Sequence, residues 1–201
     1  MQDIFEVFYD KRQIRFVIPT ALAYVLLLVP FNAFPIDLGF GVLRPADLVP
    51  VLFGVMFGPA AAWGSAFGSL IADIAGSLAG GSAGSFGLGS IFGFASKFVF
   101  AYAAYRVWRL CMGSDGSIGG IGTPQILCFL AAALVGSVAC AIVDGAGSFI
   151  LGPHEFAGAM LMVVSTTIDR FIPGAILGTA GLWLLYERAE RAGLLYSKEE
   201  K

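Results

Sequence analysis

Apolar residues dominate most of the chain, and short polar or glycine-rich stretches divide the apolar sequence into six segments. A helix that spans a bilayer needs about 20 mainly apolar residues. We expect transmembrane segments at residues 15–31, 46–58, 60–79, 89–109, 125–150 and 157–187. The second segment is short and ends at Gly58, where Pro59 begins the third. The sixth is long and contains Pro173, which predicts a kink.

This pattern predicts an all-α membrane protein that consists of a six-transmembrane-helix bundle. The bundle forms a single domain over residues 1–188, and a charged, solvated cytoplasmic tail follows over residues 189–201. The first dozen residues carry mixed charge, which is atypical of a signal peptide. They favour a short interfacial helix that turns Ile4, Phe5 and Phe8 toward lipid.

The composition supports a membrane protein and excludes other classes. Only 13% of the residues are charged, about half the fraction of a soluble domain. A net charge of −2 offers no basic surface for nucleic acid. The three cysteines lack the spacing of metal ligands. We therefore expect no nucleic-acid partner, no metal and no cofactor.

The basic residues predict the orientation of the bundle. If the N-terminus is cytoplasmic and the chain crosses six times, the C-terminus returns to the cytoplasm. Nine of the twelve basic residues then lie at cytoplasmic ends, namely Lys11, Arg12, Arg15, Arg106, Arg109, Arg188, Arg191, Lys198 and Lys201. This asymmetry is typical of cytoplasmic ends, so both termini are expected inside.

Several charged residues fall within the apolar segments or at their outer ends. A charge at the centre of a membrane helix costs about 2.5–3.5 kcal/mol, and such residues usually face the bundle interior or a wet cavity. We take as candidate substrate-binding residues Arg44, Asp73, Lys97, Asp144, Asp169 and Arg170. Asp47 lies beside Arg44, where the first outer loop meets the second segment.

Two interpretations of these charges are open. In the first, the three candidate aspartates neutralise Lys97 and Arg170 in ion pairs that serve only the structure. In the second, the charges line a polar cavity that opens to the outside and binds a small solute, which is the usual hypothesis for ionisable residues inside a membrane.

Small residues recur every fourth position in the third segment, which predicts close packing against another helix. The residues of this small-residue stripe include Ala60, Gly64 and Gly68. A serine protease site is a weak alternative reading of Ser82 and His154, since both lie in predicted outer loops and neither can bury a Ser–His pair. His154 is read as a loop residue. The alternative is that it is an axial ligand of a haem-like solute.

Residues 43–76, "LRPADLVPVLFGVMFGPAAAWGSAFGSLIADIAG", resemble the substrate-binding S components of energy-coupling factor (ECF) transporters. Members of that family often carry a Gly-Pro pair followed by spaced glycines and an aspartate. The corresponding residues here are Gly58, Pro59, Gly64, Gly68 and Asp73. The six-segment layout and the length of 201 residues agree with the family.

The resemblance implies a binding subunit and not an enzyme. Such a subunit captures a micronutrient outside with high affinity and releases it inside by reorienting in the membrane. Its partners are a membrane T component, two cytoplasmic ATPases and the lipid bilayer, in the plasma membrane of a bacterium. Family members commonly dock through alanines four apart in the first helix. Here Ala21 and Ala23 lie in that helix, and the small-residue stripe that begins at Ala60 is an alternative contact.

The resemblance also places the solute on the outer side, beneath the loops that follow the first, third and fifth segments. Gly80, Gly81 and Ser82 then form a lid loop beside Asp73. The cations suit carboxylate, phosphate or propionate groups, and a planar ring would be covered by aromatic side chains such as Phe34, Phe40, Phe86 and Phe92. A thiamine-like compound, a queuosine precursor, a pterin, cobalamin and haem all remain open. The alternative function is a non-transporting membrane scaffold.

Overall fold

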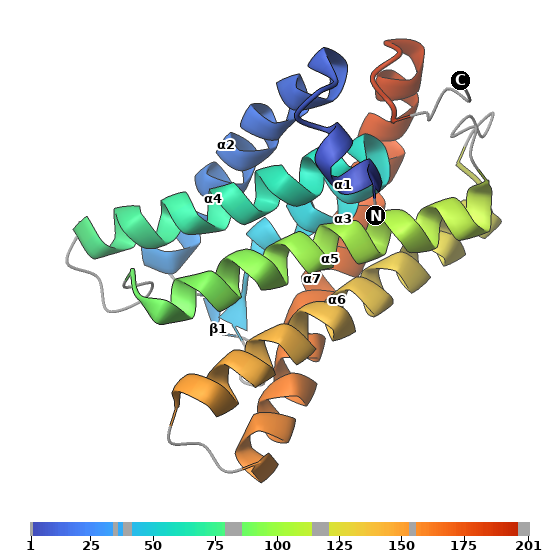
Figure 1. Cartoon of the computed structure of the whole chain (residues 1–201). Coiled ribbons are helices and arrows are strands. Elements are labelled where there is room, and N and C mark those ends of the chain that lie inside the picture. Colours follow the sequence, from blue (N-terminus) through green and yellow to red (C-terminus); the bar gives the residue numbers. More distant parts are fainter. Residues whose placement is uncertain are drawn as a thin grey trace.

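The computed structural model describes residues 2–33, 36–37, 42–78, 86–113, 121–152 and 156–196. Over these ranges the regular structure is helical apart from two strands of two residues each (Figure 1). The helices are α1 (Gln2–Glu6), α2 (Lys11–Ala33), α3 (Leu48–Phe57), α4 (Pro59–Leu78), α5 (Leu88–Met112), α6 (Thr123–Leu151) and α7 (Phe156–Arg191), with a 3-10 turn η1 (Pro45–Asp47) before α3. The strands β1 (Ile36–Asp37) and β2 (Val42–Leu43) pair antiparallel.

Each predicted segment coincides with one of the helices α2 to α7. Four of the helices in the described ranges are long and apolar enough to cross a membrane, namely α2 over Lys11–Pro30, α5, α6 and α7. Residues Pro45–Phe57 form a shorter apolar helix. The helical fold and the several membrane spans are therefore confirmed, whereas six crossings remain a prediction.

The division between α3 and α4 follows from the Gly-Pro pair. Gly58 adopts φ +59°, a conformation that side chains other than glycine rarely take. Its amide donates a hydrogen bond of 3.0 Å to the carbonyl of Gly54 and closes α3. Pro59 then occupies the first position of α4, where its missing N–H costs nothing. The two helices therefore meet at a sharp turn.

The small-residue stripe packs inside the chain, against α2. A Cβ atom added at Gly64 would lie 2.5 Å from Cβ of Thr20, and one added at Gly68 would lie 2.9 Å from the carbonyl oxygen of Ala21. Ala60 and Ala21 are both buried. The predicted helix packing is thus found, and it leaves neither the stripe nor Ala21 accessible to a T component in this structure.

The main apolar core lies where α3, α5, α6 and α7 meet. Close approaches again occur at glycines: an added Cβ at Gly54 would lie 2.6 Å from the carbonyl oxygen of Ala101, and one at Gly178 would lie 2.7 Å from Phe129. On the outside, many large apolar side chains are exposed, including Ile18, Leu22 and Leu26 on α2. Such a surface is unfavourable in water and suits the hydrocarbon of a bilayer.

The N-terminal helix α1 lies against α4. Nε1 of Trp63 donates a hydrogen bond of 2.8 Å to the carbonyl oxygen of Ile4, and the ring of Phe8 meets the Trp63 ring edge-on at 5.0 Å. Phe5 and Phe8 keep much of their surface exposed, whereas Val7 is fully buried. Two of the side chains expected to face lipid, Phe5 on α1 and Phe8 in the turn after it, are thus accessible on a segment attached to the bundle.

The chain after α7 turns back toward the bundle. Gly193 has φ +64°, and the amide of Tyr196 donates a hydrogen bond of 2.8 Å to the carbonyl oxygen of Met56 on α3. The Tyr196 ring lies 5.5 Å from that of Tyr105 on α5. The first part of the tail therefore packs on the protein, although we expected the tail to be solvated.

Candidate functional site

A buried ion pair joins α5 to the turn that precedes α3. Nζ of Lys97 lies 2.8 Å from Oδ1 of Asp47, and the two side chains are 7% and 2% exposed. Pro45 begins η1, and the amide of Asp47 closes this turn on the carbonyl of Arg44 at 3.0 Å. The turn places the Asp47 carboxylate inside the bundle, where Lys97 meets it.

A second ion pair joins α6 to α7. The guanidinium of Arg170 donates to the carboxylate of Asp144 and to the sulfur of Cys140. Cys140 and Asp144 are four residues apart, so both lie on the same face of α6. The planar fork of an arginine presents several donors at once, which allows one buried guanidinium to contact both side chains.

The two ion pairs form one unit, here called the central charge cluster. It comprises Asp47, Lys97, Cys140, Asp144 and Arg170. The charge of Arg170 acts on both partners of the first pair. A Cβ atom added at Gly174, one turn after Arg170, would lie 3.9 Å from the backbone oxygen of Asp47. Four elements, η1, α5, α6 and α7, therefore supply the cluster.

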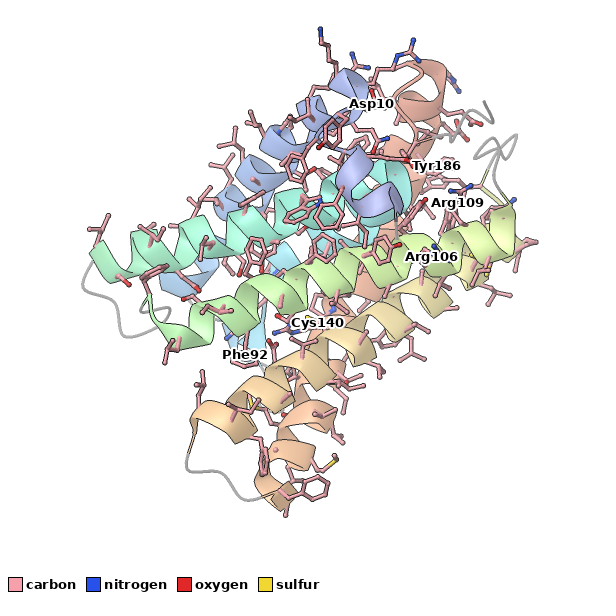
Figure 2. All side chains as sticks on the ribbon, in the orientation of Figure 1. Asp10, Phe92, Arg106, Arg109, Cys140 and Tyr186 are labelled. Atoms are coloured by element: carbon pink, nitrogen blue, oxygen red, sulfur yellow. The ribbon has the colours of Figure 1, made fainter. Side chains whose placement is uncertain are left out.

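Aromatic rings border the cluster. Nζ of Lys97 lies 5.9 Å from the ring centres of Tyr24 on α2 and of Phe100 on α5. Both rings are almost fully buried. Rings at this distance attract a cation through their negative faces, and they keep water away from the ion pairs, which strengthens electrostatic interactions there. In Figure 2, Cys140 is labelled where α6 passes α5.

The remaining candidate residues lie around this cluster and not within it. Arg44 is exposed beside η1, and its charge acts on Asp47 and on the half-buried Asp169 of α7. Asp73 is half-buried on α4, and its carboxylate would lie 3.8 Å from a Cβ added at Gly93 on α5. The structure thus brings Lys97, Asp144 and Arg170 together, sets Arg44 and Asp169 beside them, and leaves Asp73 near α5.

The pairing differs from the sequence prediction at one position. Asp144 was one of the expected partners of the two cations, and it binds Arg170. The partner of Lys97 is Asp47, which the candidate set omitted. The sequence feature that could have identified Asp47 was a carboxylate at the start of an apolar helix, in "RPADLVPVL". Tyr24 and Cys140 were also omitted, because neither carries a charge.

Several predicted site residues lie outside the described ranges. They are the lid residues Gly80, Gly81 and Ser82, the histidine His154, and the aromatic residues Phe34 and Phe40. Phe86 is exposed. Phe92 packs between helices, since a Cβ added at Gly147 on α6 would lie 2.6 Å from its ring (Figure 2). Within the described ranges, no three side chains are grouped so that they could hold a metal ion.

The cluster offers binding and not covalent chemistry. It holds two cations and two carboxylates and is therefore balanced in charge. Its Lys97 amine and its carboxylates are held in ion pairs, and the sulfur of Cys140 accepts a hydrogen bond from Arg170. Buried charges of this kind cost free energy unless they are paired, and inside a membrane they commonly mark a pathway or a binding site.

Comparisons with known proteins locate the chain in one family. The family model described as QueT transporter matches residues 17–187. This range includes the whole central charge cluster, together with Tyr24, Asp73 and Asp169. A search of curated proteins returns no significant match, and neither does a search of solved structures.

Proposed function

Because the chain belongs to the QueT transporter family, a family of ECF-transporter S components and not of enzymes, we propose that it captures a queuosine precursor from outside the cell for uptake. The expected resemblance to S components is thereby confirmed, and the protease reading of Ser82 and His154 is abandoned. The solute binds within the membrane part of the chain, at the central charge cluster and the candidate residues around it.

The observation that carries this proposal is the central charge cluster itself. Two ion pairs from four elements meet inside a protein that has several membrane spans. Packing of the bundle does not require them, because glycine and alanine contacts already bring the helices together. Burying four charged groups costs free energy, and binding of a polar solute is a reason for retaining them.

The proposal includes an orientation. The start of α2, the end of α5 and the end of α7 lie at the same end of the bundle (Figure 1). These parts of the helices carry Lys11, Arg12, Arg15, Arg106, Arg109, Arg188 and Arg191. By the usual charge asymmetry this end faces the cytoplasm. Both termini then lie inside, in the plasma membrane of a bacterium.

The partners are a membrane T component and two cytoplasmic ATPases, which drive inward release of the solute as the S component reorients. The contact proposed for the T component is a surface other than the small-residue stripe, because Ala60, Gly64 and Gly68 are buried against α2. The exposed apolar side chains of α2, among them Ile18 and Leu22, are accessible to lipid or to such a partner.

Transport by the reconstituted complex tests this function. We expect proteoliposomes that contain this chain, the T component and both ATPases to take up radiolabelled 7-aminomethyl-7-deazaguanine only when ATP is supplied. Vesicles without this chain are the control for leakage. An Arg191→Gln variant, which removes an exposed charge from the Arg191–Glu187 pair, should transport normally. Uptake that does not depend on this chain would contradict the proposal.

A second candidate, the non-transporting scaffold, is favoured by one observation. Each buried cation of the cluster is already neutralised by a carboxylate of the same chain, which is what purely structural ion pairs require. Native mass spectrometry separates the two functions. A binding subunit should retain a small molecule that is lost in cluster variants, whereas a scaffold should be free of ligand in every preparation.

A further inference from the structure

One buried oxygen of the central charge cluster has no hydrogen-bond partner in the described part of the chain. It is Oδ2 of Asp47, whose other oxygen receives the Lys97 ammonium at 2.8 Å. Asp47 as a whole is 1% exposed. An ionised carboxylate accepts several hydrogen bonds, and leaving one buried oxygen unmatched is unfavourable. A hydrogen-bond donor placed beside Oδ2 of Asp47 would therefore be stabilising.

Each cation of the cluster already binds groups of the protein. Lys97 donates a hydrogen bond to Asp47, and Arg170 donates to Asp144 and to Cys140. A carboxylate or phosphate of a solute that bound Lys97 or Arg170 would compete with Asp47 or Asp144 for that cation, and displacing either would leave a protein carboxylate buried without its partner. Breaking a buried ion pair in this way is strongly destabilising. A solute that donates hydrogen bonds and carries no net negative charge leaves both pairs intact.

The surroundings of Asp47 also suit a hydrogen-bond donor. Arg44 and Arg170 both act on the Asp47 carboxylate by their positive charge, in addition to Lys97. The carboxylate thus stays available as an acceptor, and the rings of Tyr24 and Phe100, both buried, lie 5.9 Å from the Lys97 ammonium that holds it. A hydrogen bond made to a charged group in such an environment is stronger than one made in water.

We propose that Oδ2 of Asp47 accepts an N–H group of the solute and that Asp47 is a specificity-determining residue of this site. The solute class is a nitrogen heterocycle that presents N–H donors and is neutral or cationic. Lys97 and Arg170 then hold the protein carboxylates in position and do not bind anionic groups of the solute. This inference rests on the proposed function and deepens it, because it assigns the atom that selects the solute.

Two sets of variants in purified full-length protein test the assignment. Asp47→Asn replaces one carboxylate oxygen by an NH₂ group. Lys97 requires an acceptor, so the amide oxygen stays with Lys97 and the NH₂ group faces the solute. Asp144→Asn is the matched control, because it removes the same charge from the cluster and leaves Oδ2 of Asp47 unchanged. The double variant Asp47→Leu/Lys97→Met removes the acceptor without leaving a charge unpaired, in case Asp47→Asn does not fold.

The probes are three 7-deazaguanines that differ in charge at the 7-substituent: aminomethyl, cyano and carboxyl. Calorimetry with wild-type protein should show that the carboxyl compound binds at least about tenfold more weakly than the neutral cyano compound, since its negative charge competes with Asp47 and Asp144 for Lys97 and Arg170. Asp47→Asn and the double variant should bind the cyano compound about 10- to 100-fold more weakly than wild type. Asp144→Asn should lose less affinity for this compound than either of them.

The outcomes separate the inference from the function on which it rests. Wild-type protein that binds none of the three compounds would overturn the proposed substrate and the inference together. If wild-type protein binds them and Asp47→Asn binds equally well, Oδ2 serves only a buried water, and the inference alone fails. Equal affinity for the carboxyl and cyano compounds would also overturn it. A larger loss of affinity in the variants that lack Oδ2 of Asp47 than in Asp144→Asn supports it.

Discussion

Replacing Lys97 by methionine tests whether the stability of the bundle depends on the pairing of Lys97 with the buried carboxylate of Asp47. The substitution keeps an unbranched side chain, one atom shorter, and removes the ammonium that lies 2.8 Å from Oδ1 of Asp47. Both side chains are more than nine-tenths buried, so water cannot replace the lost partner. Removing one member of such a pair costs about 3–5 kcal/mol in the free energy of unfolding.

The matched control removes both charges. In the double variant Lys97→Met/Asp47→Leu no charge remains unpaired, and replacing a buried pair by apolar side chains is often neutral or stabilising. We therefore expect the double variant to unfold close to wild type. Arg191→Gln is a second control, because the Arg191 and Glu187 side chains are 79% and 45% exposed and such a pair contributes at most about 1 kcal/mol.

Unfolding in mixed micelles with increasing denaturing detergent, followed by the fluorescence of the three tryptophans, measures these differences. A loss of 3 kcal/mol would raise the unfolding equilibrium constant by more than about a hundredfold. Equal stability of Lys97→Met and wild type would refute the reasoning, as would a double variant that is no more stable than the single one. Either result would mean that Asp47 does not depend on Lys97.

Two further predictions concern helix packing and are measured by the same unfolding assay. Gly64→Ala should destabilise the bundle by about 1–3 kcal/mol, because its Cβ would lie 2.5 Å from Thr20, and this exceeds the gain of about 1 kcal/mol in helix propensity. Gly93→Ala, with its nearest neighbours at 3.8 Å, is the control and should be neutral or stabilising; similar effects at both glycines would contradict the close packing of α4 on α2. Trp63→Phe should detach α1, since it removes the hydrogen bond to Ile4, and faster hydrogen exchange confined to residues 2–8 would show this.

The positions of the helices were predictable, because they depend on local sequence. The apolar segments are long, and Gly58 followed by Pro59 is typical of the end of one helix and the start of the next, so the prediction at this boundary was close. The small-residue stripe of α4 was also recognisable from its spacing. Its partner was not, because which helix packs against Gly64 depends on how the bundle is assembled.

The candidate site was predicted in part. Lys97, Asp144 and Arg170 stood out because a charge within an apolar segment is costly wherever the segment packs. Their pairing could not be read from the chain, since it depends on how far each helix is rotated about its axis and on where the helices cross. Asp47 lies 50 positions before Lys97, and Asp73 is nearer in sequence to Lys97 than Asp47 is, yet Asp47 forms the pair.

By itself, the sequence determined that this protein belongs in a membrane, where its helices begin and end, which end carries the basic residues, and that charges are buried in it. These properties follow from the free energy of transferring each segment between water and lipid, which is local. The tertiary structure decided that the charges form two closed pairs and that one oxygen of Asp47 remains available. Hydrogen bonds and ion pairs need atoms within about 3 Å, and only the assembled bundle brings atoms from distant helices that close.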